Sequence, residues 1–146
     1  DSKSLTKNKR EILSNYVKKN SIWAVGKASV KEIEKINILN ASLLAMKRAV
    51  KKLKKKPTLV LIDGNKLPQI KNYKLRSIIK GDKKVPSISA ASIIAKVARD
   101  KMIANSMYSL DPIEANKTKL LPISRESIAV GPTDSRLEDP KKAYIT

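Results

Sequence analysis

Two aspartates stand where predicted strands end, and a carboxylate in such a position either caps a turn or holds a metal. Asp63 follows the apolar run 58–62, and Asp82 closes the segment 77–82. Asp63 precedes Gly64, a common turn signal, and Asp82 could simply precede a helix beginning at Pro86. Carboxylates from two neighbouring strands would suit a divalent cation, because each brings charge and oxygen ligands. These residues alone leave both interpretations open.

The composition says more about the possible binding partners of the protein than about its fold. The chain has 146 residues, which fits one domain, and a formal net charge of +19 from 32 Lys and Arg against 13 Asp and Glu. Such an excess favours a polyanionic partner, nucleic acid first and an anionic membrane surface second. The alternative is a lysine-rich genome that spreads lysine over solvated faces.

Two residue types are absent, and their absence excludes several kinds of chemistry. The chain has no Cys, which rules out disulfides and thiolate metal sites, and no His, which rules out a Ser-His-Asp triad and a histidine base. Carboxylates and oxygen-preferring cations such as Mg²⁺ or Mn²⁺ remain. No apolar run has the length of a membrane span, and the start does not resemble a signal peptide, so a cytoplasmic location is expected.

The periodicity of apolar residues predicts an α/β domain. A capping box, Ser29 to Glu32, predicts a short helix, and Asn40 is expected to cap the next one. After about Tyr108 prolines interrupt the chain, and residues 109–146 are predicted to be irregular or disordered. The expected helices cover residues 6–19, 29–36, 41–53 and 86–106, and the expected strands cover residues 21–28, 58–62 and 75–79.

Two charged features have ordinary explanations beside functional ones. The lysine-rich segment 47–56 could neutralise phosphates, and a solvated helix face accounts for it equally well. Arg99 and Asp100 sit late in the last predicted helix, where a surface ion pair is the simpler interpretation.

Taken together and in order, the motifs resemble the ribonuclease HII family, the type 2 ribonucleases H. The longest similar segment, residues 87–100, reads SISAASIIAKVARD, close to the family's SIAAASIIAKVTRD. The segment LIDGN at 61–65 is similar to the family's VDGN strand end. The other matching segments are DSKSL at 1–5, NIL at 37–39, LAMKRA at 44–49 and IKGD at 79–82.

This resemblance implies a ribonuclease H-like fold, a mixed sheet flanked by helices, and a monomeric enzyme. It implies cleavage of the RNA strand of RNA–DNA hybrids and nicking at ribonucleotides embedded in DNA, leaving 5′-phosphate and 3′-hydroxyl ends. It implies four carboxylates around Mg²⁺ or Mn²⁺, two of which correspond to Asp63 and Asp82. Lys3 and Lys80 lie beside the matching motifs and are assigned to contact with backbone phosphate.

The chain also departs from the family pattern. The family's other two carboxylates belong to a DEAGRG segment on its first strand, and the chain begins after it, so the fold is expected to lack its first two strands. Neither a GYGT-like segment nor an HR-x-SF ending is present. We therefore expect a partial catalytic domain at 1–108 and an aberrant tail at 109–146.

Two alternative functions remain. A catalytically inactive nucleic-acid-binding fragment would follow from the missing first-strand carboxylates. A small basic ribosomal-type protein would explain the charge but not the ordered motifs. A missing first strand also predicts a folding defect, because the strand 58–62 would lose a neighbour and expose an apolar edge prone to aggregation.

Overall fold

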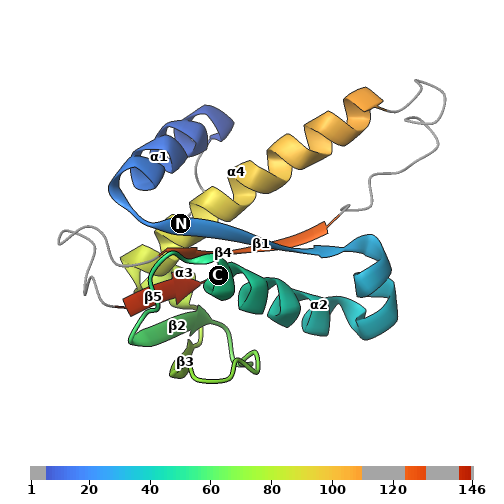
Figure 1. The fold of residues 1–146 in the computed structure, drawn as a ribbon. Helices are drawn as coiled ribbons and strands as arrows, with labels where there is room; N and C mark the ends of the chain where they lie inside the picture. The colour runs from blue at the N-terminus through green and yellow to red at the C-terminus, as the bar shows by residue number, and fades with distance from the viewer. Residues whose placement is uncertain (1–5, 110–123, 131–141, 146) are drawn as a thin grey trace.

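The computed structural model describes residues 6–109, 124–130 and 142–145. Helices α1 and α4 lie on one side of a five-stranded sheet and α2 lies on the other (Figure 1). The predicted α/β class, with a mixed sheet flanked by helices, is confirmed. The elements are α1 (Lys7–Asn20), β1 (Trp23–Ser29), α2 (Val30–Lys52), β2 (Leu59–Asp63), β3 (Leu75–Ile78), α3 (Gly81–Lys84), α4 (Pro86–Ser109), β4 (Ser124–Val130) and β5 (Lys142–Ile145).

The sheet has the order β1-β4-β5-β2-β3, so strands distant in sequence are neighbours in space. β4 pairs antiparallel with β1 and with β5. β5, β2 and β3 are parallel, with Val60 opposite both Ala143 and Leu75. Parallel strands all begin along one edge of a sheet, the amino edge, and all end along the opposite one, the carboxyl edge. The last residue of β2 therefore lies at the carboxyl edge of these three strands.

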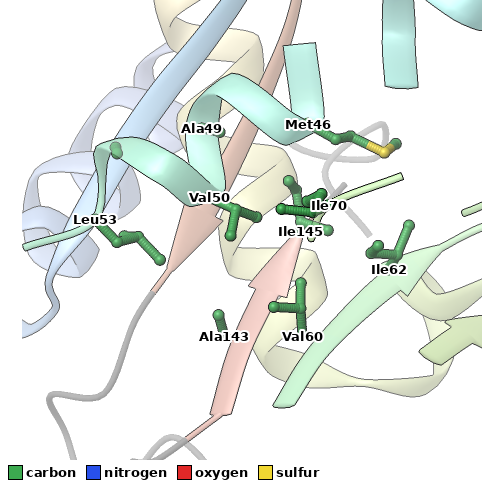
Figure 2. Close-up of a cluster of buried hydrophobic side chains, with 10 residues drawn as sticks. Met46, Ala49, Val50, Leu53, Val60, Ile62, Ile70, Ala143 and Ile145 are labelled. Carbon is green, nitrogen blue, oxygen red and sulfur yellow. The ribbon is translucent and has the colours of Figure 1, made fainter. Parts of the chain in front are cut away.

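Alternating side chains of the central strands enter two separate cores. Val60 and Ile62 of β2 pack toward α2 together with Ala143 and Ile145 of β5, as Figure 2 shows. Leu61 points the opposite way, into a cluster with Ile88 of α4. Because a strand buried on both faces needs apolar residues at every position, the continuous run in β2 is explained.

β1 shows the other strand pattern, a regular alternation. Ala24, Gly26 and Ala28 are buried toward α2, whereas Trp23 is exposed and Val25 packs on the α4 side. A Cβ atom on Gly26 would lie only 2.0 Å from the carbonyl oxygen of Ala45, so α2 rests directly on the glycine backbone.

Replacing Gly26 with alanine should therefore destabilise the fold severely. The added methyl meets helix backbone rather than a flexible side chain, and overpacking of this kind costs about 3 kcal/mol or more. Urea unfolding measures the loss. Lys27→Ala, an exposed neighbour in the same strand, is the control and should change stability by less than about 0.5 kcal/mol. Equal urea midpoints for the two variants would contradict this packing.

α2 bends at Asn37, whose positive φ of 70° and ψ of 168° are not helical. The Asn37 side-chain oxygen accepts a hydrogen bond from the backbone N–H of Asn40 at 3.0 Å, so Asn37 caps the second half of the helix. The prediction that Asn40 caps it was wrong by one helical turn. The predicted capping box at Ser29 and Glu32 is confirmed.

An ion pair braces the two halves of this bent helix. Arg48 donates two hydrogen bonds to the Glu32 carboxylate, at 2.8 and 2.6 Å, and a third to the carbonyl oxygen of Lys27. The hydrogen bond from the Arg48 side chain, followed by that from the Ser29 backbone, lowers the pKa of Glu32 to about 2. The ionised form of Glu32 is therefore more stable in the folded chain than in the unfolded one.

This pair predicts a pH dependence of stability. A carboxyl group whose folded pKa is depressed contributes stability above its unfolded value, here about 4.5, and loses it as the pH falls toward about 2. Glu32→Gln should therefore flatten the plot of urea midpoint against pH in that window. Arg48→Gln should have the same effect, and combining both should add little. A Glu32→Gln profile parallel to wild type would show that the pair does not matter in solution.

Two strands lie in the segment 109–146, which the sequence predicted to be irregular. That prediction was wrong for β4 and β5, and the remainder of the segment lies outside the described residues. β5 pairs with β2 over Leu59–Ile62, so β2 has a neighbour on each side. The exposed apolar edge predicted at residues 58–62 is not found. A division of the chain at residue 108 stays a prediction.

Across the described stretches, none of the helices combines the length and the apolar character that crossing a lipid bilayer requires.

Candidate metal-binding site

Asp63 is the last residue of β2 and stands at the carboxyl edge of the parallel strands. Val60, Leu61 and Ile62 before it are buried, which fixes the strand in the sheet. Gly64 follows with φ +118°, a conformation that residues with a side chain rarely adopt, and its N–H donates to the Ile78 carbonyl at 2.9 Å. The chain therefore turns sharply here, and the Asp-Gly turn signal is real.

The Asp63 carboxylate is hydrogen-bonded by the segment that follows β3. Its Oδ1 accepts a hydrogen bond from the backbone N–H of Gly81 at 2.8 Å. Lys80 has left-handed backbone angles, φ 54° and ψ 40°, and so turns the chain from β3 into α3. Asp63 thus has a defined orientation besides its place in a turn.

Asp82 lies in the single helical turn α3 rather than at a strand end. β3 ends at Ile78, and α3 is closed by the Val85 N–H donating to the Gly81 carbonyl at 2.8 Å. The predicted strand end at Asp82 was therefore wrong. The sequence left open whether Asp63 and Asp82 lie close together. The charge of Asp82 raises the pKa of Asp63, and joint metal binding by the two carboxylates stays a prediction.

Burial is the largest influence on Asp63 and raises the pKa of its carboxyl group above the ordinary value. The negative charge of Asp82 raises it further, while backbone N–H groups of Gly81 and Asp82 lower it. The ionised Asp63 is consequently less well solvated than in water and faces a like charge. A cation near both carboxylates would offset both effects.

Gly81 is the site residue that the sequence interpretation missed. A Cβ there would lie 2.8 Å from Cδ1 of the buried Ile88 and 3.4 Å from Oδ1 of Asp63. A larger residue at this position would require the Ile88 side chain to shift, so glycine favours the close approach of α3 to the end of β2 and the start of α4. Its position between Lys80 and Asp82 was visible in the sequence, but the contact partner was not.

The predicted basic residues are placed differently. Lys80 is exposed beside the carboxylates, whereas Lys3 lies outside the described residues. Asp100 forms an ion pair with Arg10 of α1 at 3.8 Å, which agrees with the structural interpretation of that residue. Neither Arg10 nor Asp100 belongs to the site.

A divalent metal is compatible with the two carboxylates but is not enclosed by the described residues. Carboxylate oxygens are the ligands that Mg²⁺ and Mn²⁺ prefer, and Mg²⁺ is often held by one or two carboxylates with water at the remaining positions. Within the described ranges, no cluster of three or more His, Cys, Asp or Glu side chains is present. Asp63 and Asp82 are the residues that would hold the ion.

Fold and site together define an α/β protein with paired acidic residues at the carboxyl edge of a mixed sheet. A sequence model of the family described as Ribonuclease HII matches residues 1–116. The chain belongs to the Ribonuclease HII family.

Three relatives, each named Ribonuclease HII, show the extent of the similarity. The protein of Pelagibacter ubique is 78% identical over 103 residues, covering 70% of this chain and 55% of the relative. That of Nitrosospira multiformis is 56% identical over 101 residues, covering 68% and 50%. That of Borrelia recurrentis is 49% identical over 119 residues, covering 80% and 66%. The chain thus spans between half and two thirds of the length of these relatives.

Proposed function

We propose that the protein is a metal-dependent endonuclease that hydrolyses the RNA strand of RNA–DNA hybrids and nicks DNA at embedded ribonucleotides. The placement of Asp63 carries this proposal: it is oriented by the Gly81 N–H, coupled to Asp82, and belongs to a Ribonuclease HII chain. Products would carry 5′-phosphate and 3′-hydroxyl ends. The location of the protein would be cytoplasmic and its active form a monomer.

The residues have distinct roles in this proposal. Asp63 and Asp82 would hold Mg²⁺ or Mn²⁺, and the bound ion would supply an activated water and stabilise charge on the phosphate. Lys80, exposed beside Asp82, would contact a backbone phosphate, and Lys3 is proposed for the same role. Gly81 would keep Asp63 oriented whether or not substrate is bound.

A second candidate is nucleic-acid binding without catalysis. The observation that favours it is the composition of β5, the parallel neighbour of β2. β5 consists of Lys142, Ala143, Tyr144 and Ile145 and brings no carboxylate to the edge where Asp63 stands. Two carboxylates hold a divalent cation less well than four, because ligand charge sets the affinity.

A cleavage assay separates the two candidates. The substrate is a DNA duplex with one embedded ribonucleotide, assayed with Mn²⁺ against an all-DNA duplex as control. The nuclease proposal predicts site-specific nicking by a chimera that supplies the two further carboxylates implied by the family resemblance. The binding-only candidate predicts duplex binding without nicking by the 146-residue chain. Robust nicking by the chain itself would rule out the binding-only function. An inactive chimera that folds and binds duplex would contradict the nuclease proposal.

A further inference from the structure

Lysines from two separate loops meet at the amino edge of the parallel strands. Lys54, Lys55 and Lys56 lie between α2 and β2, and Lys71 and Lys74 lie just before β3. β2 and β3 are parallel, and the Val60 N–H donates to the Lys74 carbonyl at 2.9 Å, so both loops open at the same edge. We call these five lysines the basic edge.

One contact joins the two loops through their side chains. The Lys56 ammonium group lies 4.9 Å from the centroid of the Tyr73 ring, a cation–π distance. Tyr73 itself is half-buried and packs against the core between α2 and the sheet. The basic edge is therefore anchored to the folded core.

The two described loops that form the basic edge, residues 53–58 and 64–74, contain no acidic residue. All five lysines are exposed, and from residue 35 to residue 81 the sequence contains one acidic residue, Asp63. The ion pairs measured in the described part of the chain, Arg10–Asp100 and Arg48–Glu32, use other residues.

The basic edge is also remote from the carboxylates. Asp63 ends β2 and the lysines precede its start at Leu59. Four strand steps separate those two residues, which corresponds to about 13 Å. The basic edge and the candidate metal site consequently occupy opposite ends of the same strand.

We propose that the basic edge binds the sugar-phosphate backbone of a nucleic acid duplex, without reading its sequence. Lysine ammonium groups neutralise phosphates as point charges and release the counterions condensed on the duplex. A membrane surface is less suitable, because interfacial binding needs apolar side chains that insert into lipid. Of the large exposed apolar residues in the described part of the chain, Leu67 lies in one of the two loops, and the others, such as Ile12, Leu39 and Ile79, belong to other segments.

The choice of nucleic acid as the partner rests on the proposed function. The description of the basic edge as an exposed, positively charged surface does not depend on that function. The test therefore uses an all-DNA duplex without divalent cations, so that no cleavage can contribute. Affinity is measured by fluorescence anisotropy between about 50 and 200 mM salt. The test variant is Lys54→Gln/Lys55→Gln/Lys56→Gln. The control, Lys7→Gln/Lys9→Gln/Lys19→Gln, removes the same charge from exposed positions on α1.

We expect the slope of log K against log salt to fall in magnitude by about 2–3 for the test variant, because each phosphate contact contributes about 0.9. The α1 control should change it by less than about 1, and replacing the same three lysines with arginine should preserve it. If the glutamine variant fails to fold by circular dichroism, Lys71→Gln/Lys74→Gln replaces it and should lower the slope by about 1–2.

Equal loss in the test and control variants would overturn the proposal, since general charge would then explain binding. It would also be overturned if the test variant kept its duplex affinity and lost binding only to vesicles of anionic lipid. Cleavage results do not enter either comparison, so failure of the nuclease proposal remains distinguishable from failure of the basic edge.

Discussion

Asp63→Asn is expected to remove divalent-cation binding from the chain and to abolish cleavage in the chimera that supplies the two further carboxylates. The amide keeps the shape of the side chain. Its oxygen can still accept the hydrogen bond that the Gly81 N–H donates to Asp63 at 2.8 Å in the wild-type structure, so the turn is retained. What it loses is the negative charge that a cation requires. Loss of a residue that only supports a metal ligand costs 10–100-fold in affinity, so loss of a ligand should cost at least about 100-fold.

Folding should not suffer from this substitution. Burial raises the pKa of Asp63, so the ionised carboxylate is less stable in the folded chain than in the unfolded one, a cost that the amide does not have. Thermal unfolding without metal should therefore show Asp63→Asn to be at least as stable as wild type. Loss of function would then not be attributable to unfolding.

Asp100→Asn provides the matched control, because it removes one carboxylate from α4 that pairs with Arg10. Titration calorimetry with Mn²⁺ should give wild-type affinity for this variant and greatly reduced affinity for Asp63→Asn. Asp82→Asn should also weaken binding, to a smaller extent. If Asp63→Asn bound Mn²⁺ and cleaved substrate like wild type, Asp63 would be a turn residue only.

The second large effect is expected from β5, although it is only four residues long. Ala143, Tyr144 and Ile145 are buried, and Ile145 packs with Ile62 and Val50 in the core beneath α2 (Figure 2). Ile145→Ala should destabilise the chain by about 2–5 kcal/mol, the usual range for a buried isoleucine. A domain has about 5–15 kcal/mol in total, so deleting residues 142–146 should abolish cooperative unfolding.

Ile12→Ala is the control for this experiment. It makes the same chemical change at a position that is 68% exposed on α1, and should alter stability by less than about 0.5 kcal/mol. Urea unfolding compares the two variants, and hydrogen exchange follows Val60–Ile62. If Ile145→Ala were as mild as Ile12→Ala, and deletion left β2 protected, β5 would not complete the sheet. The exposed β2 edge expected from the sequence would then describe the chain correctly.

The local sequence determined the elements whose signals are contained within one turn or one strand. Ser29 and Glu32 are three residues apart and form the predicted capping box by themselves. The alternation of Ala24, Gly26 and Ala28 fixes which face of β1 is buried. The order of the motifs along the chain was enough to identify the family, because comparing motifs does not depend on which residues are in contact.

Tertiary structure decided which of these elements meet. β5 joins β2 across about eighty residues of chain, and its own four residues, preceded by charged residues and proline, are too few to show a strand periodicity. Its place is set by the need of Val60 and Ile62 to have covered neighbours and paired backbone groups, an energetic requirement of the assembled sheet. A propensity argument made on residues 109–146 alone could not include that requirement.

The candidate site shows the same division. The sequence singled out Asp63 and Asp82 because carboxylates stand after apolar runs, and the turn at Gly64 was predictable from its residue type. The left-handed backbone of Lys80, the Gly81 hydrogen bond and the helical turn at Asp82 arise where β2, β3 and α4 come together. Residue types determined that a carboxylate site could exist here, and packing between distant segments decided how Asp63 is oriented, because hydrogen-bond geometry depends on contacts that sequence spacing does not specify.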